Sequence, residues 1–364
     1  MAGISLDKTP PSAAVRVGLA VRRALHRAGD RLLPPEVIAW EKVTAAGTTR
    51  VIGALVEVGA IDSLGRRPAG SAAIASELGL DADTLERVLR MAAEDDLLRR
   101  HRNGTYELTA IGEALGSGHS PTISHWARYM NTNAVQQAWG NLPETIRTGQ
   151  PSFPATHGKS VWSHMAENPD EERLFANAMR ELSGLVKAWV VNGYPWPDTG
   201  TVCDVAGGSG PLLAAILEAR PRLRGVIVEA AGVLPEADAH LQEAGVRDRV
   251  DLIEGNIFER VDAAADIYTL KDILHDWDDE RSLQILRTVK AAMMPGSKVV
   301  LVETLLDPDD PDPIAVRIDL QMLTQCDGGR QRSVAELQSL LTRANLRPGE
   351  VHRTGGPAMI EGIA

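Results

Sequence analysis

The feature that most limits the folds open to this chain is an apolar segment that ends in a cluster of glycines. Residues 202–210 read Val-Cys-Asp-Val-Ala-Gly-Gly-Ser-Gly, and a helical pattern begins at Pro211. A second apolar run ends at Glu229, nineteen residues beyond Gly210. A strand, a glycine turn, a helix and a strand tipped with an acid form half of a nucleotide-binding α/β unit, in which the acid can bind ribose hydroxyls. The sequence therefore predicts an enzyme with an adenosine-containing cofactor.

The spacing of the glycines bears on the choice of cofactor. Dinucleotide folds favour Gly-x-Gly-x-x-Gly, in which the third glycine allows close packing of helix on strand. Here Gly208-x-Gly210 is followed by Leu213, so the third glycine is absent, which weakly disfavours NAD. A tight turn without a ligand is the alternative. It is disfavoured because Glu229 stands at the ribose spacing of about 20 residues.

Composition narrows the class of protein. A chain of 364 residues with 44% hydrophobic residues predicts two domains, or one domain with a large appendage. The net charge of −11 argues against a general nucleic-acid binder. Cys203 and Cys326 are the only cysteines, and Cys203 lies in a predicted buried strand, which fits a reducing cytoplasm. With no apolar stretch of 18 residues and no signal-like N-terminus, we expect a cytoplasmic protein without a membrane partner.

The N-terminal part predicts helices and a winged-helix module. Residues 1–34 form a partly helical arm that could pack on another subunit. Ser71 to Leu78 and a stretch from Asp83 have helical spacing, and Leu97 to Thr109 has Asn103-Gly104 at the centre of a hairpin pattern. The module raises DNA binding as an alternative. Acids on its second helix would repel phosphates, so we interpret it as a packing or dimerisation element.

Residues 121–186 have a helical pattern and hold an unusual share of the aromatic side chains. Such a concentration favours a wall for a flat apolar ligand, although a helical core is an equally good interpretation of any single residue. The aromatic residues are Trp126, Tyr129, Trp139, Phe153, Trp162 and Phe175.

Strands and helices alternate beyond Glu229, which predicts a mostly parallel sheet. Ligands of such sheets bind at the carboxyl ends of the strands. We therefore expect one edge to gather the polar or glycine residues that stand at those ends, namely Gly207, Glu229, Asn256, Lys271 and Glu303.

His275 is the residue most open to a chemical role, because it follows the fourth strand of this alternation. It lies in the run His-Asp-Trp-Asp-Asp-Glu, whose acids at 278–280 suit the first turn of a helix. His275-Asp276 could also suggest a metal site. No second histidine or acid recurs at ligand spacing, so no metal is expected.

Several motifs in one order give the chain a family resemblance. They are the glycine turn, the run around His275, Val-Glu-Thr-Leu at Glu303 and Gly-Gly-Arg-Gln-Arg-Ser at 328–333. Leu85-Glu-Arg-Val-Leu-Arg90, Tyr106-Glu-Leu-Thr109 and Phe175-Ala-Asn-Ala-Met179 match as well. Over roughly residues 40–364 the chain resembles the S-adenosylmethionine-dependent O-methyltransferases of plant phenolic and bacterial polyketide metabolism.

The resemblance implies two domains and a homodimer. Residues 1–185 would form a mainly α-helical, winged-helix dimerisation domain that also carries the substrate-wall helices. Residues 186–364 would form an α/β, Rossmann-like domain that binds S-adenosylmethionine. The acceptor implied is a small aromatic molecule.

The resemblance also implies roles for individual residues. His275 would be the general base, Glu303 would orient it, and Gln331 would stand beside it where many relatives have a second glutamate. Met179 and Asp276 would contact the acceptor. The cofactor would be bound by Ser183, Asp204, Gly207, Gly210, Glu229, Asn256, Ile257 and Lys271.

Three positions depart from the family pattern. Ala206 replaces the first glycine of the turn, and its methyl group is tolerable only if φ is not positive there. Asn256 stands where an acid commonly meets the adenine amine, and its carbonyl can still accept that hydrogen bond. Gln331 cannot stabilise an imidazolium as an anion would, so we expect either a weaker base or an acceptor that ionises more easily.

The chemistry agrees with methyl transfer to an oxygen. A sulfonium methyl is already activated, so the enzyme must supply in-line geometry and a deprotonated acceptor. A histidine in hydrogen-bond reach of a phenol can take its proton as the new bond forms. O-methylation of a phenolic hydroxyl on an aromatic, polyketide-like natural product is therefore the main hypothesis. A relative that uses the cofactor for hydroxylation, decarboxylation or a pericyclic step is the alternative.

Overall fold

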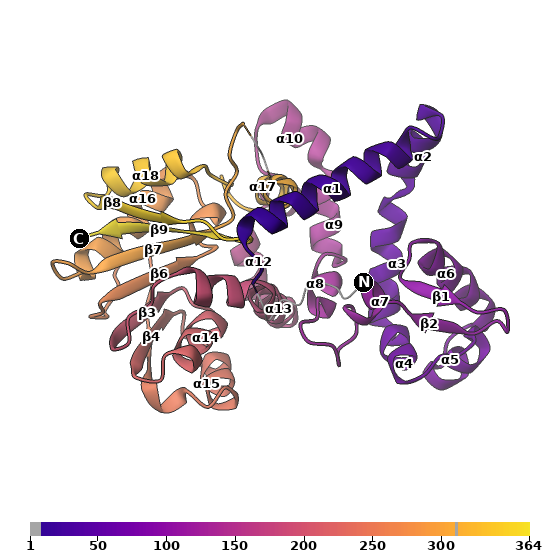
Figure 1. Cartoon of the computed structure of the whole chain (residues 1–364), viewed down its shortest axis with the longest axis horizontal. Coiled ribbons are helices and arrows are strands. Elements are labelled where there is room, and N and C mark those ends of the chain that lie inside the picture. The colour runs from indigo at the N-terminus through magenta and orange to yellow at the C-terminus, as the bar shows by residue number, and fades with distance from the viewer. Residues whose placement is uncertain (1–8, 310–311) are drawn as a thin grey trace. The chain divides into compact units, whose positions relative to one another are not determined.

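The structure is a computed structural model that describes residues 9–309 and 312–364 (Figure 1). The chain divides into two compact units. The first unit contains the described residues up to Val17, together with Gln137–Glu167 and Ser183–Ala364. The second contains Gly18–Gln136 and Asn168–Leu182. Within the described residues, no helix is both long and apolar enough to cross a membrane.

A seven-stranded sheet forms the centre of the first unit, with strand order β5-β4-β3-β6-β7-β9-β8. The first five strands in this order are parallel, and β9 pairs antiparallel with both β7 and β8. The predicted mostly parallel sheet is confirmed. The strands are β3 (Gly200–Val205), β4 (Leu223–Glu229), β5 (Val250–Glu254), β6 (Ile267–Lys271), β7 (Lys298–Glu303), β8 (Arg347–His352) and β9 (Ala358–Ile363).

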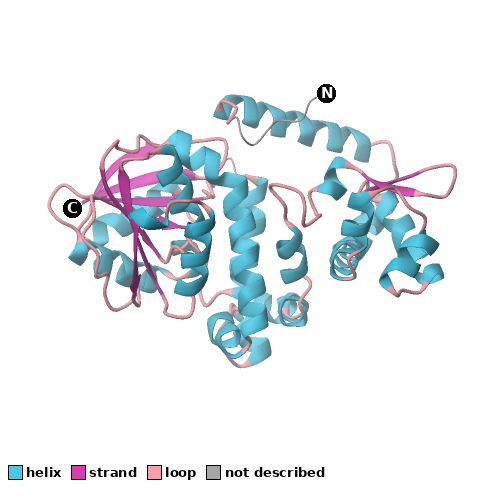
Figure 2. Cartoon of the chain, turned by 90° about the horizontal axis from the view of Figure 1, so that it is seen from below, coloured by secondary structure: helices cyan, strands magenta, loops and turns pink. Residues whose placement is uncertain are grey.

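Helices cover both faces of this sheet (Figure 2). Successive residues of β3 alternate between two apolar clusters, with Cys203 and Val205 in one and Val202 in the other. The first cluster is completed by side chains of α16 (Asp279–Ala292) and α18 (Val334–Arg343). The second is completed by α14 (Pro211–Ala219), α15 (Leu234–Glu243) and the end of α13 (Pro169–Gly193). Burial on both faces explains why the strands are almost continuously apolar.

Local sequence signals fix where the key helices begin. Gly210 precedes α14 with φ of 77°, and Pro211 occupies the first turn, where no backbone donor is needed. Asp278 caps α16 by accepting the backbone N–H of Arg281. Ser333 and Glu336 form a reciprocal capping box at the start of α18. These caps set the loops that precede α16 and α18, and both loops carry site residues.

The second unit contains the predicted winged helix. Its two helices, α5 (Ser71–Leu78) and α6 (Ala82–Glu94), are followed by the antiparallel strands β1 (Leu98–Arg100) and β2 (Tyr106–Leu108). Ile74, Leu89 and Tyr106 are fully buried in the core of this unit. The basic side chains of the hairpin lie beside acids, because Arg100 pairs with Glu86 and Arg99 with Glu107.

The N-terminal arm is helical, as expected. Neither α1 (Ser12–Asp30) nor α2 (Pro35–Thr44) contains a buried residue. Leu25 is 68% exposed and Trp40 67% exposed, so both helices present apolar side chains to solvent.

Short helices complete the described chain. They are α3 (Ala46–Glu57), α4 (Ala60–Arg66), α7 (Ala110–Glu113), α8 (Ser124–Tyr129), α9 (Asn133–Gly140), α10 (Leu142–Thr148), α11 (Ser152–His157), α12 (Val161–Glu167) and α17 (Pro313–Gln325), with 3₁₀ turns η1 (Arg247–Arg249) and η2 (Leu274–Asp276).

The six aromatic residues expected to line a ligand wall are divided between the two units. Trp126, Tyr129 and Phe175 belong to the second unit, where Tyr129 and Phe175 pack with ring centroids 5.1 Å apart. Phe153 belongs to the first unit and is 1% exposed. Trp162, also in the first unit, stacks on Trp277. Tyr129 and Phe153 are therefore core residues, as the alternative interpretation holds.

Candidate active site

The carboxyl ends of the five parallel strands lie at one edge of the sheet. Register pairs Val205 of β3 with Val228 of β4, Glu229 with Glu254 of β5, and Lys271 of β6 with Val302 of β7. The predicted gathering of Gly207, Glu229, Asn256, Lys271 and Glu303 at one edge follows from these pairings, because each residue ends or follows one of these strands.

The glycine turn between β3 and α14 takes the shape that its residues permit, with one exception. Gly208 and Gly210 have φ of 57° and 77°, where L side chains are strained. Ala206 also has a positive φ, of 55°. The expectation that Ala206 avoids a positive φ is wrong. Its N–H donates to the carbonyl of Val228, so pairing with the neighbouring strand holds this residue in the left-handed conformation.

Two acids support the turn, of which Asp204 is buried and Glu229 is partly buried. Asp204 is 2% exposed and accepts the hydroxyl of Thr269 at 2.7 Å, and burial raises the pKa of Asp204 to about 6. The Glu229 carboxylate accepts the N–H of Gly208 at 2.9 Å and that of Ala230 at 2.8 Å. Burial raises the pKa of Glu229, and these two hydrogen bonds oppose the rise. Glu229 therefore links the end of β4 to the glycine turn.

The other predicted cofactor residues have distinct surroundings. Asn256 is exposed, and its side chain accepts the N–H of Phe258 and donates to Glu259. Ile257 packs against the sheet cluster that contains Cys203. Lys271 pairs with Asp272 at the end of β6. Ser183 is buried in the part of α13 that belongs to the first unit.

His275 lies in η2, the short turn that follows β6, and its side chain is 11% exposed. Its Nδ1 is 2.9 Å from the side-chain nitrogen of Gln331 and 3.5 Å from Oε2 of Glu303. Its Nε2 is 3.5 Å from Oδ1 of Asp276. The fold therefore places Glu303 and Gln331 on one ring nitrogen and Asp276 near the other.

Carboxylates control the electrostatics around this ring. Burial disfavours the imidazolium, but Glu303, Asp276 and Asp272 outweigh burial and raise the pKa of His275. Burial raises the pKa of Glu303 to about 7 and that of Asp276 to about 6. Burial also opposes ionisation of Asp272, whose pKa is nevertheless lowered by Lys271 and His275. His275 and Glu303 therefore form an acid–base pair in which the charge of each group affects the protonation of the other.

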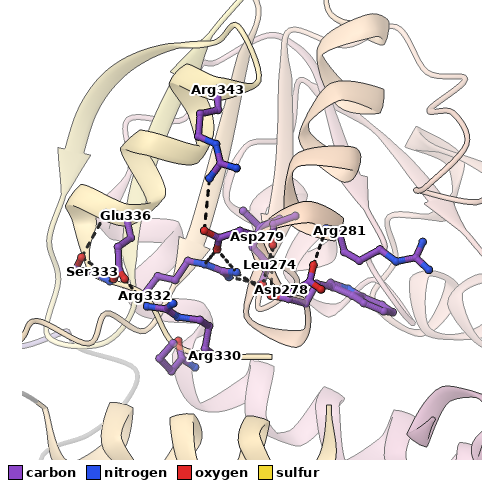
Figure 3. Close-up of polar contacts among 12 residues, drawn as sticks. Leu274, Asp278, Asp279, Arg281, Arg330, Arg332, Ser333, Glu336 and Arg343 are labelled. Carbon is purple, nitrogen blue, oxygen red and sulfur yellow. Dashed lines mark hydrogen bonds and ion pairs between the residues drawn. The ribbon is translucent and has the colours of Figure 1, made fainter. Parts of the chain in front are cut away.

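The segment from Gly329 to Arg332 contacts the His275 turn along its whole length. A Cβ on Gly329 would stand 2.8 Å from the carbonyl oxygen of His275, so only glycine allows this approach. The N–H of Arg330 donates to that same carbonyl at 2.8 Å. The guanidinium of Arg332 donates to the carbonyls of Leu274 and Trp277 (Figure 3).

Gly329 and Arg332 were not among the predicted site residues. Their partners are more than 50 positions away in the sequence. The capping-box pattern that starts at Ser333 is the one sequence signal that places Arg332 just before a helix.

Three potential metal ligands lie close together at the His275 turn. Asp272, His275 and Glu303 have ligating atoms within 4.8 Å of one another, the one such group among the described residues. The fold thus supplies acids that sequence spacing did not reveal. Lys271, Gln331 and the N–H of Leu274 already form hydrogen bonds with these three side chains, as an acid–base cluster requires.

Met179 belongs to the second unit, so its contact with an acceptor stays a prediction.

Comparison with known proteins identifies the family. A family model for the O-methyltransferase domain matches residues 139–347, and one for the O-methyltransferase dimerisation domain matches residues 40–117. The chain is 31% identical to the mitomycin biosynthesis 6-O-methyltransferase of Streptomyces lavendulae, with 94% of each chain covered. It is 35% identical to the O-demethylpuromycin-O-methyltransferase of Streptomyces alboniger, covering 81% of this chain and 79% of the relative.

A solved structure gives the same result. An O-methyltransferase from neocarzinostatin biosynthesis, in complex with S-adenosyl-L-homocysteine and 1,4-dihydroxy-2-naphthoic acid, is 32% identical. Its TM-score is 0.75, over 87% of this chain and 96% of the other. The chain therefore belongs to the S-adenosylmethionine-dependent O-methyltransferases of aromatic natural products, and it combines their catalytic domain with their dimerisation domain.

Proposed function

We propose that the chain methylates a phenolic hydroxyl of an aromatic, polyketide-like natural product, with His275 as the proton acceptor. The observation that carries the proposal is the surroundings of the His275 ring. Nδ1 faces Glu303 and Gln331, and the turn that carries the ring follows β6, the strand next to β3 and its glycine turn. The proton acceptor and the glycine turn thus stand at adjacent strand ends.

The residues at the strand ends fit S-adenosylmethionine. The position where a Cβ of Gly208 would stand has no atom within 4 Å, so there is open space beside the turn. Glu229, with its partly buried carboxylate at the end of β4, supplies an acceptor for ribose hydroxyls. When bound, the cofactor supplies an already activated methyl group. We assign the cofactor contacts to Ser183, Asp204, Gly207, Gly210, Glu229, Asn256, Ile257 and Lys271.

The chain's own contribution is to orient the acceptor and remove its proton. A neutral imidazole with its proton on Nδ1 presents a free lone pair on Nε2. Oε2 of Glu303 has no hydrogen-bond partner, although it lies 3.5 Å from Nδ1, so a small rotation lets it accept the Nδ1 proton. Oε1 of Gln331 is also buried without a partner, and a turn of the amide would bring it to Nδ1. Both groups can thus hold the tautomer that leaves Nε2 basic. Proton removal by a positioned histidine contributes roughly 10²–10⁴-fold in rate.

The test is incubation with methyl-labelled cofactor and a panel of phenols that begins with 1,4-dihydroxy-2-naphthoic acid. Mass spectrometry should show a gain of one CH₂ in an acceptor. His275→Ala should reduce turnover by at least 10²-fold while binding S-adenosylhomocysteine as the wild type does. Unchanged turnover in this variant removes His275 from the mechanism. A product without the added CH₂ supports a non-methylating reaction instead.

We also propose that the protein is a homodimer, with domains that divide near residue 185. The match of residues 40–117 to a dimerisation domain supports the homodimer, and so do the exposed apolar side chains of α1 and α2. Light scattering should give twice the chain mass of 39.1 kDa, and a monomer mass at micromolar concentration would contradict it.

A further inference from the structure

Arg332 is a buried arginine whose two terminal nitrogens donate to the two ends of the turn that carries His275. Its side chain is 2% exposed. Nη1 donates to the carbonyl of Leu274 at 2.7 Å, and Nη2 donates to the carbonyl of Trp277 at 2.8 Å (Figure 3). Leu274 and Trp277 flank His275 and Asp276, so one guanidinium spans both ends of the turn.

The turn is held from other directions as well. The N–H of Leu274 donates to Oε1 of Glu303 at 3.1 Å, and the carbonyl of His275 accepts the N–H of Arg330. Ser282 approaches the same two carbonyls as Arg332, but at the longer distances of 3.3 and 3.5 Å. Arg332 therefore makes the shortest contacts to both flanking carbonyls.

An anion keeps the buried charge of Arg332 in place. Oδ1 of Asp279 accepts from Nε at 3.1 Å and from Nη2 at 2.9 Å. Arg343 also approaches Asp279, at 3.5 Å, but its side chain is 45% exposed. Lysine in place of Arg332 could not reproduce these contacts, because one ammonium lacks the planar fork that reaches two carbonyls and a carboxylate together.

We propose that Arg332 is a positioning residue for methyl transfer, which fixes the turn from Leu274 to Trp277 so that the His275 ring meets the acceptor hydroxyl in one orientation. This inference rests on the proposed function, in which His275 takes the proton. A displacement of about 1 Å at a reacting group can cost about 10²-fold in rate, so a looser turn should lower turnover strongly.

The competing explanation is that Arg332 only stabilises the fold. The two explanations differ in what happens to enzyme that remains folded. The charge of Arg332 also opposes protonation of Glu303, in a cluster whose other charged groups are Lys271, Asp272, Asp276 and His275. Loss of that charge lets the His275–Glu303 pair bind a proton more readily. A purely structural role would change neither kcat nor its pH profile in folded enzyme.

Two substitutions separate geometry from charge. Arg332→Lys keeps the charge but loses the fork, and Arg332→Gln loses both. Arg343→Gln is the matched control, because it removes an arginine from the same carboxylate without touching the turn. His275→Ala reports on the proposed function itself. Each variant is made in the full chain, and folding is checked by calorimetric binding of S-adenosylhomocysteine.

The kinetic assay uses the best phenol from the panel. Arg332→Lys should lower kcat ten- to a hundredfold, with KM and the affinity for S-adenosylhomocysteine within about threefold of wild type. Arg332→Gln should lower kcat at least as much and move the acid limb of its pH profile upward by roughly half a unit to one unit. Arg343→Gln should stay within twofold of wild type. A kcat within threefold of wild type in both Arg332 variants overturns the inference.

Hydrogen exchange supplies a readout that needs no acceptor. Amides of the peptide 273–278 should exchange at least tenfold faster in the Arg332 variants, while those of β6 and β7 keep wild-type rates. Equal acceleration throughout the sheet would overturn the inference in favour of a purely structural role. If both variants fail to fold, Asp279→Asn replaces them and should speed exchange in 273–278, with wild-type rates counting against the inference.

The outcomes distinguish a failure of the proposed function from a failure of the positioning role of Arg332. If His275→Ala retains wild-type turnover, the proposed function fails. If His275→Ala is inactive and the Arg332 variants are not, the proposed function stands and the positioning role fails. If the wild type methylates no phenol in the panel, the proposed function fails, and the exchange rates in 273–278 still decide whether Arg332 holds the turn.

Discussion

Replacing Ala206 by glycine should stabilise the protein, although the substitution removes a methyl group from a half-buried position. Ala206 has φ of 55°, a conformation that costs an L residue about 1–2 kcal/mol because Cβ approaches the following carbonyl oxygen. Glycine removes that strain. Glycine also gives the unfolded chain more conformational freedom, which lowers the free energy of unfolding by about 0.4–1 kcal/mol. The free energy of unfolding should therefore rise by about 1 kcal/mol.

The measurement is native-state hydrogen exchange of the β3 amides, which reports the unfolding free energy of this unit rather than of the whole two-unit chain. Ala214→Gly is the matched control. Ala214 is 3% exposed in the interior of α14, where glycine costs about 1 kcal/mol. The two identical substitutions should thus have opposite signs. A loss of stability in Ala206→Gly as large as in Ala214→Gly would show that the left-handed conformation stores no strain.

Two further substitutions probe the site. Gln331→Glu places an anion 2.9 Å from Nδ1 of His275, so the pKa of the imidazole should rise. The acid limb of the kcat profile should then move upward by about one to two pH units. An unmoved limb would contradict the contact between residue 331 and the ring. Glu229→Gln should weaken S-adenosylhomocysteine binding about ten- to a hundredfold in calorimetry, through loss of a charged acceptor. The exposed Glu254, which ends the neighbouring strand, is its control, and equal effects of Glu229→Gln and Glu254→Gln would remove Glu229 from the ribose site.

The parts of the fold that sequence predicts well are those fixed by local patterns. The strand that ends before the glycine turn, the winged-helix pair and the hairpin around Asn103-Gly104 each depend on neighbours in the chain. Helix α17 and strand β8 were not predicted. Strand β8 contains Pro348 and Gly349, residues that weaken a strand pattern, and it lies at the edge of the sheet, where such residues are tolerated.

The site was predictable to the extent that parallel strands end at one edge. This rule brings Glu229, Lys271 and Glu303 together without any knowledge of packing. The conformation of Ala206 could not be predicted in the same way. An alanine in a glycine turn suggests a negative φ, and only the hydrogen bond from its N–H to Val228 on the neighbouring strand shows that tertiary structure imposes the positive one.

Different residues of the segment from Gly329 to Arg332 hold the backbone of the His275 turn and contact the His275 ring. Gly329, the N–H of Arg330 and the guanidinium of Arg332 hold the backbone of the His275 turn, whereas Gln331 alone contacts the imidazole. The residue that tunes the ring can therefore change from glutamate to glutamine without loss of a backbone contact. An amide at this position can either donate to Nδ1 or accept from it, whereas an ionised carboxylate only accepts. The tautomer in this chain then depends on Glu303, whose unpartnered Oε2 is the one carboxyl oxygen within 3.5 Å of Nδ1 among the described residues.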